Sequence, residues 1–156
     1  MKLGDLLKEG QIITGFQSRD KWEAITRLVD LLIAQGRLED GQRTAAFAAL
    51  AARERVASTG MEFGVALPHA SVEGLEGALA AVGLSSSGIP FQTPDGQPAR
   101  IVVLLLIPHR ERLQHTSTLA GIARLLNYEE TREALARARN AREALQIIRD
   151  EEQRGA

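Results

Sequence analysis

A histidine that follows a short apolar run is the residue best suited to chemistry in this sequence. His69 comes directly after Val65-Ala66-Leu67-Pro68, and the residues before that run include Ser58-Thr59-Gly60, which is typical of a polar loop. Free imidazole has a pKa of about 6.5, so a neutral and nucleophilic fraction is present near physiological pH. A loop of small residues offers backbone N–H groups to an anion. The segment therefore predicts a histidine that reacts with, or holds, a phosphoryl group.

The same segment resembles the active-site motif of a known family. The matching residues are Arg53-Glu54, Thr59-Gly60 and Gly64-Val65-Ala66-Leu67-Pro68-His69. This pattern is similar to that of the bacterial phosphotransferase system (PTS) enzyme IIA domains of the fructose/mannitol/nitrogen type, and the resemblance extends from about Leu3 to Ile148. It implies one PTS enzyme IIA type-2-like domain over residues 1–156, with a core over about 3–148 and no cofactor. The implied fold is a small mixed β-sheet flanked by helices.

Four further residues are candidates to hold the phosphoryl group. The family has a second active-site histidine before a helix, and His115 falls on that position, which implies that it stabilises the phosphoryl group. The resemblance also places Arg53 near the phosphorylated histidine, where a guanidinium can contact two phosphate oxygens. Thr59 and Gly60 are expected to supply hydroxyl and backbone donors. The structural alternatives are a polar helix start for His115, a helix-end cation for Arg53 and simple loop geometry for Thr59 and Gly60.

The resemblance implies a phosphoryl relay, and hence a phosphotransferase component with a phosphohistidine intermediate. A phosphorylated histidine-containing carrier protein would dock over His69, and the phosphoryl group would pass to this ring and then to an enzyme IIB domain in sugar uptake. The alternative is a stand-alone nitrogen-type regulator that binds target proteins according to the phosphorylation of His69. Glu62 and Phe63 depart from the usual motif, and Phe63, Val65 and Leu113 are candidate docking contacts.

Two other kinds of enzyme are weaker alternatives. A metal-dependent hydrolase would use His69, His109 and His115, but no HExxH or carboxylate–histidine spacing surrounds them. His109 follows a proline in a charged connector and is expected to be exposed and inert. A Ser/His/Asp triad lacks a G-x-S-x-G nucleophile elbow.

The composition narrows the class of protein further. A chain of 156 residues fits one domain, and because 44% of residues are apolar but only 4% aromatic, the core is expected to consist of Ala, Leu, Val and Ile. A net charge of −1 favours neither nucleic acid nor an anionic membrane as a partner. The absence of cysteine excludes disulfides and thiol catalysis. No signal peptide or membrane-spanning run is visible, so a cytoplasmic protein without direct membrane insertion is expected.

The helices that must position these residues follow from apolar periodicity. A helix is predicted over 19–35, capped by Ser18 and ended by Gly36, and a second over 41–53, which would place Arg53 beside the Ser58-Thr59-Gly60 loop. A third helix should follow residue 112 and end at Asn127. A C-terminal helical region contains Leu135 to Ile148, and residues 151–156 are expected to be a frayed tail.

Strands are predicted over 12–16, 65–67, 77–84 and 101–107. Ser85-Ser86-Ser87-Gly88 is expected to end the third strand, and Thr93-Pro94-Asp95-Gly96 is a strong turn signal. Residues 101–107 show no polar alternation, which indicates an inner strand covered on both faces. The predicted helices alternate with the predicted strands, and there is one hairpin signal. This order predicts an α/β sandwich around a mixed sheet.

Overall fold

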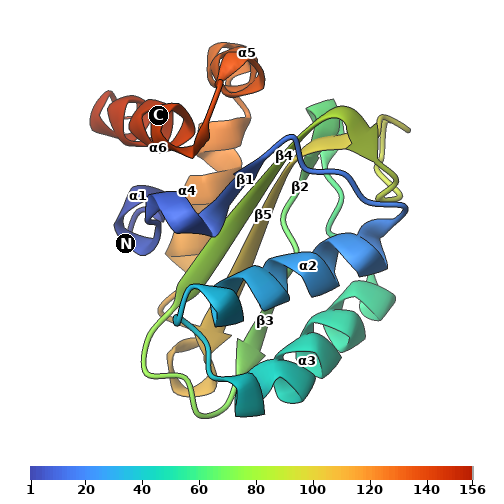
Figure 1. Ribbon diagram of the computed structural model, residues 1–156, viewed down its shortest axis with the longest axis vertical. Coiled ribbons are helices and arrows are strands. Elements are labelled where there is room, and N and C mark those ends of the chain that lie inside the picture. The colour runs from blue at the N-terminus through green and yellow to red at the C-terminus, as the bar shows by residue number, and fades with distance from the viewer. Residues whose placement is uncertain (156) are drawn as a thin grey trace.

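A mixed five-stranded sheet lies between two layers of helices in the computed structural model, which describes residues 1–155 (Figure 1). Its central strands β4 (Leu79–Ile89) and β5 (Ala99–Pro108) pair antiparallel. Strand β1 (Ile12–Thr14) lies parallel beside β4, and the two short strands β2 (Val65–Ala66) and β3 (His69–Val72) both lie parallel beside β5. The predicted fold class, a mixed sheet flanked by helices, is confirmed.

Each face of the sheet has its own hydrophobic core, and strand β5 contributes side chains to both because they alternate between the faces. Val102, Leu104 and Leu106 belong to the core under α2 (Lys21–Ala34) and α3 (Arg43–Val56). The alternate residues, from Ile101 to Ile107, pack into a second core on the opposite face. All residues from Ile101 to Pro108 are buried, which confirms the inner strand predicted from the sequence.

The second face of the sheet is covered by helices from both ends of the chain (Figure 1). These are α1 (Leu3–Leu6), α4 (Thr116–Leu126), α5 (Glu129–Arg137) and α6 (Ala141–Gln153). The described part of the chain also contains four short 3₁₀ turns: η1 (Glu9–Gln11), η2 (Asp40–Gln42), η3 (Glu62–Gly64) and η4 (His109–Glu111). None of the helices within residues 1–155 combines the length and apolar character needed to cross a bilayer.

Several element boundaries differ from the predictions. Helix α2 starts after Asp20 rather than Ser18, because the Asp20 side chain accepts a hydrogen bond from the Glu23 backbone N–H. Gly36 ends this helix as predicted, with φ at 70°. Ser85-Ser86-Ser87-Gly88 was predicted to end a strand, which is wrong. Strand β4 continues through it to Ile89, across a shift in register that accommodates Gly88 at a φ of 86°.

The prediction of a frayed tail from residue 151 is also wrong for residues 151–153. Helix α6 continues to Gln153, and the Glu152 carboxylate accepts hydrogen bonds from the backbone N–H groups of Leu3 and Gly4. These N–H groups begin α1 and have no partner inside that helix, so Glu152 satisfies them. Residue 156 of the predicted tail lies outside the described residues.

Candidate functional site

His69 is the first residue of β3, and its ring contacts the backbone of Leu67, two residues earlier in the chain. Ala70 and Val72 pack into the core under α3, so His69 and Ser71 belong to the opposite face of the strand. The ring is half-buried, and its Nδ1 lies 2.8 Å from the backbone carbonyl oxygen of Leu67. A carbonyl oxygen only accepts hydrogen bonds, so this contact assigns the proton to Nδ1. Nε2 is left with an unprotonated lone pair.

The surroundings of His69 favour its neutral form. Burial lowers the pKa of the ring below its ordinary value of 6.5, and the positive charge of Arg53 lowers it further. The hydrogen bond to Leu67 and the charge of Glu54 act in the opposite direction, but the net pKa shift is downward. The ring is therefore mostly neutral near pH 7, and Nε2 is available as a nucleophile.

Arg53 lies in the last turn of α3, close enough to His69 for its charge to act on the ring. Its Nη1 donates a hydrogen bond of 2.7 Å to the carbonyl oxygen of Ala57, just after the helix. The other N–H groups of this guanidinium have no hydrogen-bond partner within residues 1–155. They remain available for an anion that binds beside His69.

Thr59 is fastened to the end of α3 by Glu54. This carboxylate accepts hydrogen bonds from the Thr59 backbone N–H at 2.7 Å and from the Thr59 hydroxyl at 2.6 Å. It also forms an ion pair of 3.2 Å with Lys21, whose ammonium donates a second hydrogen bond of 2.8 Å to the side chain of Gln92. Glu54 thus joins α3, the start of α2, the Thr59 loop and the loop after β4 through a buried set of charges.

The candidate phosphate donors Thr59 and Gly60 have internal partners in this structure. Both donors of Thr59 are used by Glu54, and the Gly60 N–H donates to the Ser58 hydroxyl oxygen at 3.1 Å. A Cβ added to Gly60 would lie 2.7 Å from the carbonyl oxygen of Phe91, so glycine is required for this close approach. A direct role of either residue toward phosphate stays a prediction, since it needs these hydrogen bonds to exchange.

His115 is the residue that precedes α4, as predicted, and it is buried. Its Nε2 lies 3.1 Å from a carboxylate oxygen of Glu111, and its Nδ1 lies 3.0 Å from the hydroxyl oxygen of Thr118. A carboxylate is an acceptor, so Nε2 carries a proton in this contact. His115 would have to exchange Glu111 for a phosphoryl oxygen in order to donate to it. No hydrogen bond joins His115 to His69 in the part of the chain that is described.

Sequence reasoning overlooked the roles of two residues around the site. Glu54 was noted only as part of a motif, although it holds Thr59 in place. Ser71 lies two residues after His69 on the same strand face, and its hydroxyl is 3.5 Å from Nδ1 of His109. Strand periodicity would have indicated Ser71, whereas the approach of His109 depends on the path of η4. Residues 1–155 contain no group of three or more potential metal-ligating His, Cys, Asp or Glu side chains.

The candidate docking contacts divide into exposed and buried residues. Phe63 is 51% exposed and Leu113 is 81% exposed, so both are accessible to a partner. Val65 is 2% exposed, because its side chain packs into the core beneath α4, and the expectation that it forms part of a docking surface is wrong.

Comparisons with known proteins show which family this chain is related to. Residues 5–151 match the family model described as "Phosphoenolpyruvate-dependent sugar phosphotransferase system, EIIA 2". The chain belongs to this family of PTS enzyme IIA domains. The family resemblance inferred from the Arg53-to-His69 motifs is thereby confirmed.

Relatives of both the sugar and the nitrogen type are similar to this IIA domain. The fructose-specific EIIA component of Haloferax volcanii is 35% identical over 127 residues, which cover 81% of this chain and 79% of the relative. A nitrogen regulatory protein of Bradyrhizobium diazoefficiens is 30% identical over 148 residues, which cover 95% of each chain. The crystal structure of nitrogen regulatory protein IIA-Ntr from Neisseria meningitidis superimposes with a TM-score of 0.83 at 27% identity, covering 94% of this chain and 98% of that one.

Proposed function

We propose that this IIA domain is a phosphocarrier that accepts a phosphoryl group on Nε2 of His69. The donor is the phosphorylated histidine-containing carrier protein, and the acceptor is an enzyme IIB component. The observation that carries the proposal is the 2.8 Å contact between Nδ1 of His69 and the Leu67 carbonyl oxygen. It leaves a lone pair on Nε2 and keeps the ring in one tautomer and one orientation.

The proposed transfer step requires neither a metal nor a nucleotide. The Nε2 lone pair of His69 forms a bond to phosphorus while the bond from phosphorus to the donor imidazole breaks, and the donor nitrogen keeps that electron pair. The proton on Nδ1 stays in place, and the Leu67 carbonyl stabilises the positive charge that the ring gains. Since donor and product are both phosphohistidines, the step is readily reversible. In such a step the protein contributes mostly by positioning the two imidazole rings and by stabilising the charge on the transferred phosphoryl group.

Arg53 is the side chain best placed to stabilise the transferred group. Its unused N–H groups can contact phosphoryl oxygens beside His69. His115 would contribute by exchanging Glu111 for a phosphoryl oxygen. Thr59 and Gly60 would contribute by shaping the loop next to the ring, and directly if their donors exchange partners.

Reconstitution tests the phosphocarrier proposal. The chain is incubated with phosphoenolpyruvate, enzyme I and the histidine-containing carrier protein, and the product is measured by mass spectrometry and by ¹⁵N NMR of the histidine rings. We expect one acid-labile phosphoryl group, attached to Nε2 of His69. His69→Gln should remain unlabelled, and His109→Gln should be labelled like the wild type. An unlabelled wild type, labelling of His69→Gln, or phosphate on Nδ1 would contradict the proposal.

The second candidate is a regulator that binds target proteins according to the phosphorylation of His69. The nearly full mutual coverage with a nitrogen regulatory protein favours it. Phosphorylation adds close to two negative charges at His69, which is enough to switch an interface. Transfer of labelled phosphate to a sugar-specific IIB component would favour the carrier role. Retention of a target by only one phosphorylation state, with no transfer, would favour regulation. We place either role in the cytoplasm.

A further inference from the structure

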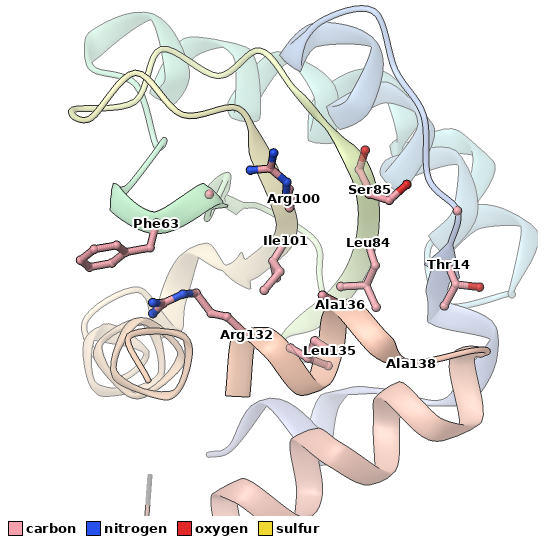
Figure 2. A pocket seen from close by; sticks show the side chains of 13 residues that line it. Thr14, Phe63, Leu84, Ser85, Arg100, Ile101, Arg132, Leu135, Ala136 and Ala138 are labelled. Carbon is pink, nitrogen blue, oxygen red and sulfur yellow. The ribbon is translucent and has the colours of Figure 1, made fainter. Parts of the chain in front are cut away.

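A cavity of about 380 Å³ lies between the sheet and helix α5 (Figure 2). It is lined by Ile101 of β5, whereas His69 pairs with Leu105 of the same strand. At about 3.3 Å per residue, these two positions are roughly 13 Å apart along β5. The cavity is therefore separate from the phosphoryl site, and the proposed function makes no use of it.

The floor of the cavity is apolar. Leu84 of β4 and Ile101 of β5 form it from the sheet, and Leu135 of α5 faces them from the helical layer (Figure 2). Cavities that bind small molecules have volumes from about 300 Å³ upward and are mostly apolar with a few polar groups. This one is at the small end of that range, so it fits a molecule with a compact hydrocarbon body.

The charged groups at the cavity are both positive. Arg100 of β5 and Arg132 of α5 approach it from two sides (Figure 2), and no Asp or Glu is among the described residues that line it. Arg132 is fixed in place, since it donates to the carbonyl oxygens of Leu126 and Asn127 and its Cζ lies 4.6 Å from the centroid of the Phe63 ring. Arg100 has no hydrogen bond or ion pair with any of residues 1–155. The cavity thus offers a free guanidinium beside an apolar floor.

A buried hydroxyl supplies a second donor. Ser85 is 3% exposed and lines the cavity, and its oxygen accepts a hydrogen bond of 3.0 Å from the Gly88 N–H. Its own proton has no acceptor within residues 1–155. A hydroxyl can both accept and donate, so Ser85 is able to donate to a ligand.

We propose that this cavity binds a small organic carboxylate with an apolar body. The carboxylate lies against Arg100, which can donate two parallel hydrogen bonds to its oxygens, and Ser85 adds a donor. The hydrocarbon body covers Leu84, Ile101 and Leu135 and removes them from water. A cation is repelled by the two arginines, and inorganic phosphate leaves the apolar floor uncovered. The proposal goes beyond the phosphocarrier function and does not depend on it.

An NMR titration of the ¹⁵N-labelled full chain tests the proposal with hexanoate and benzoate as probes. We expect saturable shifts of the backbone signals of residues 84–86, 100–101 and 132–138, and little change at His69. Hexanol, hexylamine and inorganic phosphate, which each lack either the negative charge or the apolar body, should bind at least tenfold more weakly.

Three variants make the test specific. Arg100→Gln should weaken hexanoate binding about tenfold or more, because a charge-assisted pair is lost. Arg137→Gln removes a charge from the same helix as Arg132 but outside the cavity lining, and should leave the affinity unchanged. Ala136→Phe should fill the cavity and abolish binding while His69 is still phosphorylated.

Several results would overturn the carboxylate site. These are the absence of saturable shifts with both acids, equal binding of hexanol or phosphate, or an equal effect of Arg137→Gln and Arg100→Gln. Because labelling of His69 is measured separately, failure of the carboxylate site would leave the phosphocarrier proposal intact.

Discussion

Replacing Glu54 by Gln is predicted to destabilise the fold strongly, although the two side chains have nearly the same shape. The Glu54 side chain is 1% exposed and that of its partner Lys21 is 9% exposed. Removal of one partner from a buried ion pair costs about 3–5 kcal/mol, because the other charge stays buried without compensation. Lys21 keeps its hydrogen bond to Gln92, and the single oxygen of the new amide can still accept one of the two hydrogen bonds from Thr59. We therefore expect a loss of about 3 kcal/mol of unfolding free energy, at the lower end of the range for a broken buried ion pair.

Urea unfolding followed by circular dichroism measures this change, with thermal unfolding as a second readout. A loss of about 3 kcal/mol corresponds to a fall in Tm of roughly 6–12 °C for a domain of this size. Arg43→Gln is the matched control. It breaks the ion pair with Asp30, in which both side chains are 47% exposed, and should cost less than about 1 kcal/mol.

A double variant separates the buried charge from the lost hydrogen bonds. Lys21→Met combined with Glu54→Gln leaves no uncompensated charge, so it should be more stable than Glu54→Gln alone. The reasoning would be refuted if Glu54→Gln cost no more than Arg43→Gln, or if the double variant lost as much as the two single variants together. Since Glu54 also holds Thr59, phosphorylation of His69 should slow in Glu54→Gln under conditions where the protein is fully folded.

Three further predictions concern the site itself. The NMR titration midpoint of His69 should fall below pH 6.5, because burial and the charge of Arg53 lower the pKa of its ring. The neutral ring then contributes fully to the stability of the fold above pH 6.5, and this contribution is lost as the pH falls through the folded-state pKa. A midpoint above pH 6.5 would contradict the prediction. Gly60→Ala should displace the loop and slow phosphorylation severalfold, because its Cβ would press on the carbonyl oxygen of Phe91, whereas Gly41→Ala has open space and should be neutral or slightly stabilising in both assays. His115→Gln should slow phosphorylation and cost about 1–2 kcal/mol of unfolding free energy, since one buried and one partly buried hydrogen bond are disturbed. Unchanged kinetics would exclude His115 from the site.

Local patterns were enough to predict the parts of the fold that local forces determine. The unbroken aliphatic run that ends at Ile107 predicted an inner strand, and strand β5 is buried there. Gly36 predicted a helix end because glycine readily adopts a left-handed conformation, and its φ is indeed positive. His69 was identified because proline, an apolar run and a family motif all coincide there. These features need no knowledge of distant partners.

The predictions that were wrong depended on contacts between distant segments. Ser85-Ser86-Ser87-Gly88 has the composition of a turn, but pairing of β4 with β5 on both sides of the register shift keeps it extended. Residues 151–153 look like a free end, but Glu152 is held by the first helix of the chain. Likewise, nothing near Glu54 in the sequence indicates Lys21 as its partner. Tertiary structure overrides local propensity in each case.

The group that sets the tautomer of His69 is a peptide carbonyl rather than a side chain. No amino-acid replacement at position 67 removes that oxygen, so point mutation cannot easily reverse which nitrogen carries the proton. Under the proposed function, the course of the main chain between β2 and β3 therefore determines which ring nitrogen reacts. Relatives that keep this course are expected to present the same nitrogen, even where every side chain around the imidazole has changed.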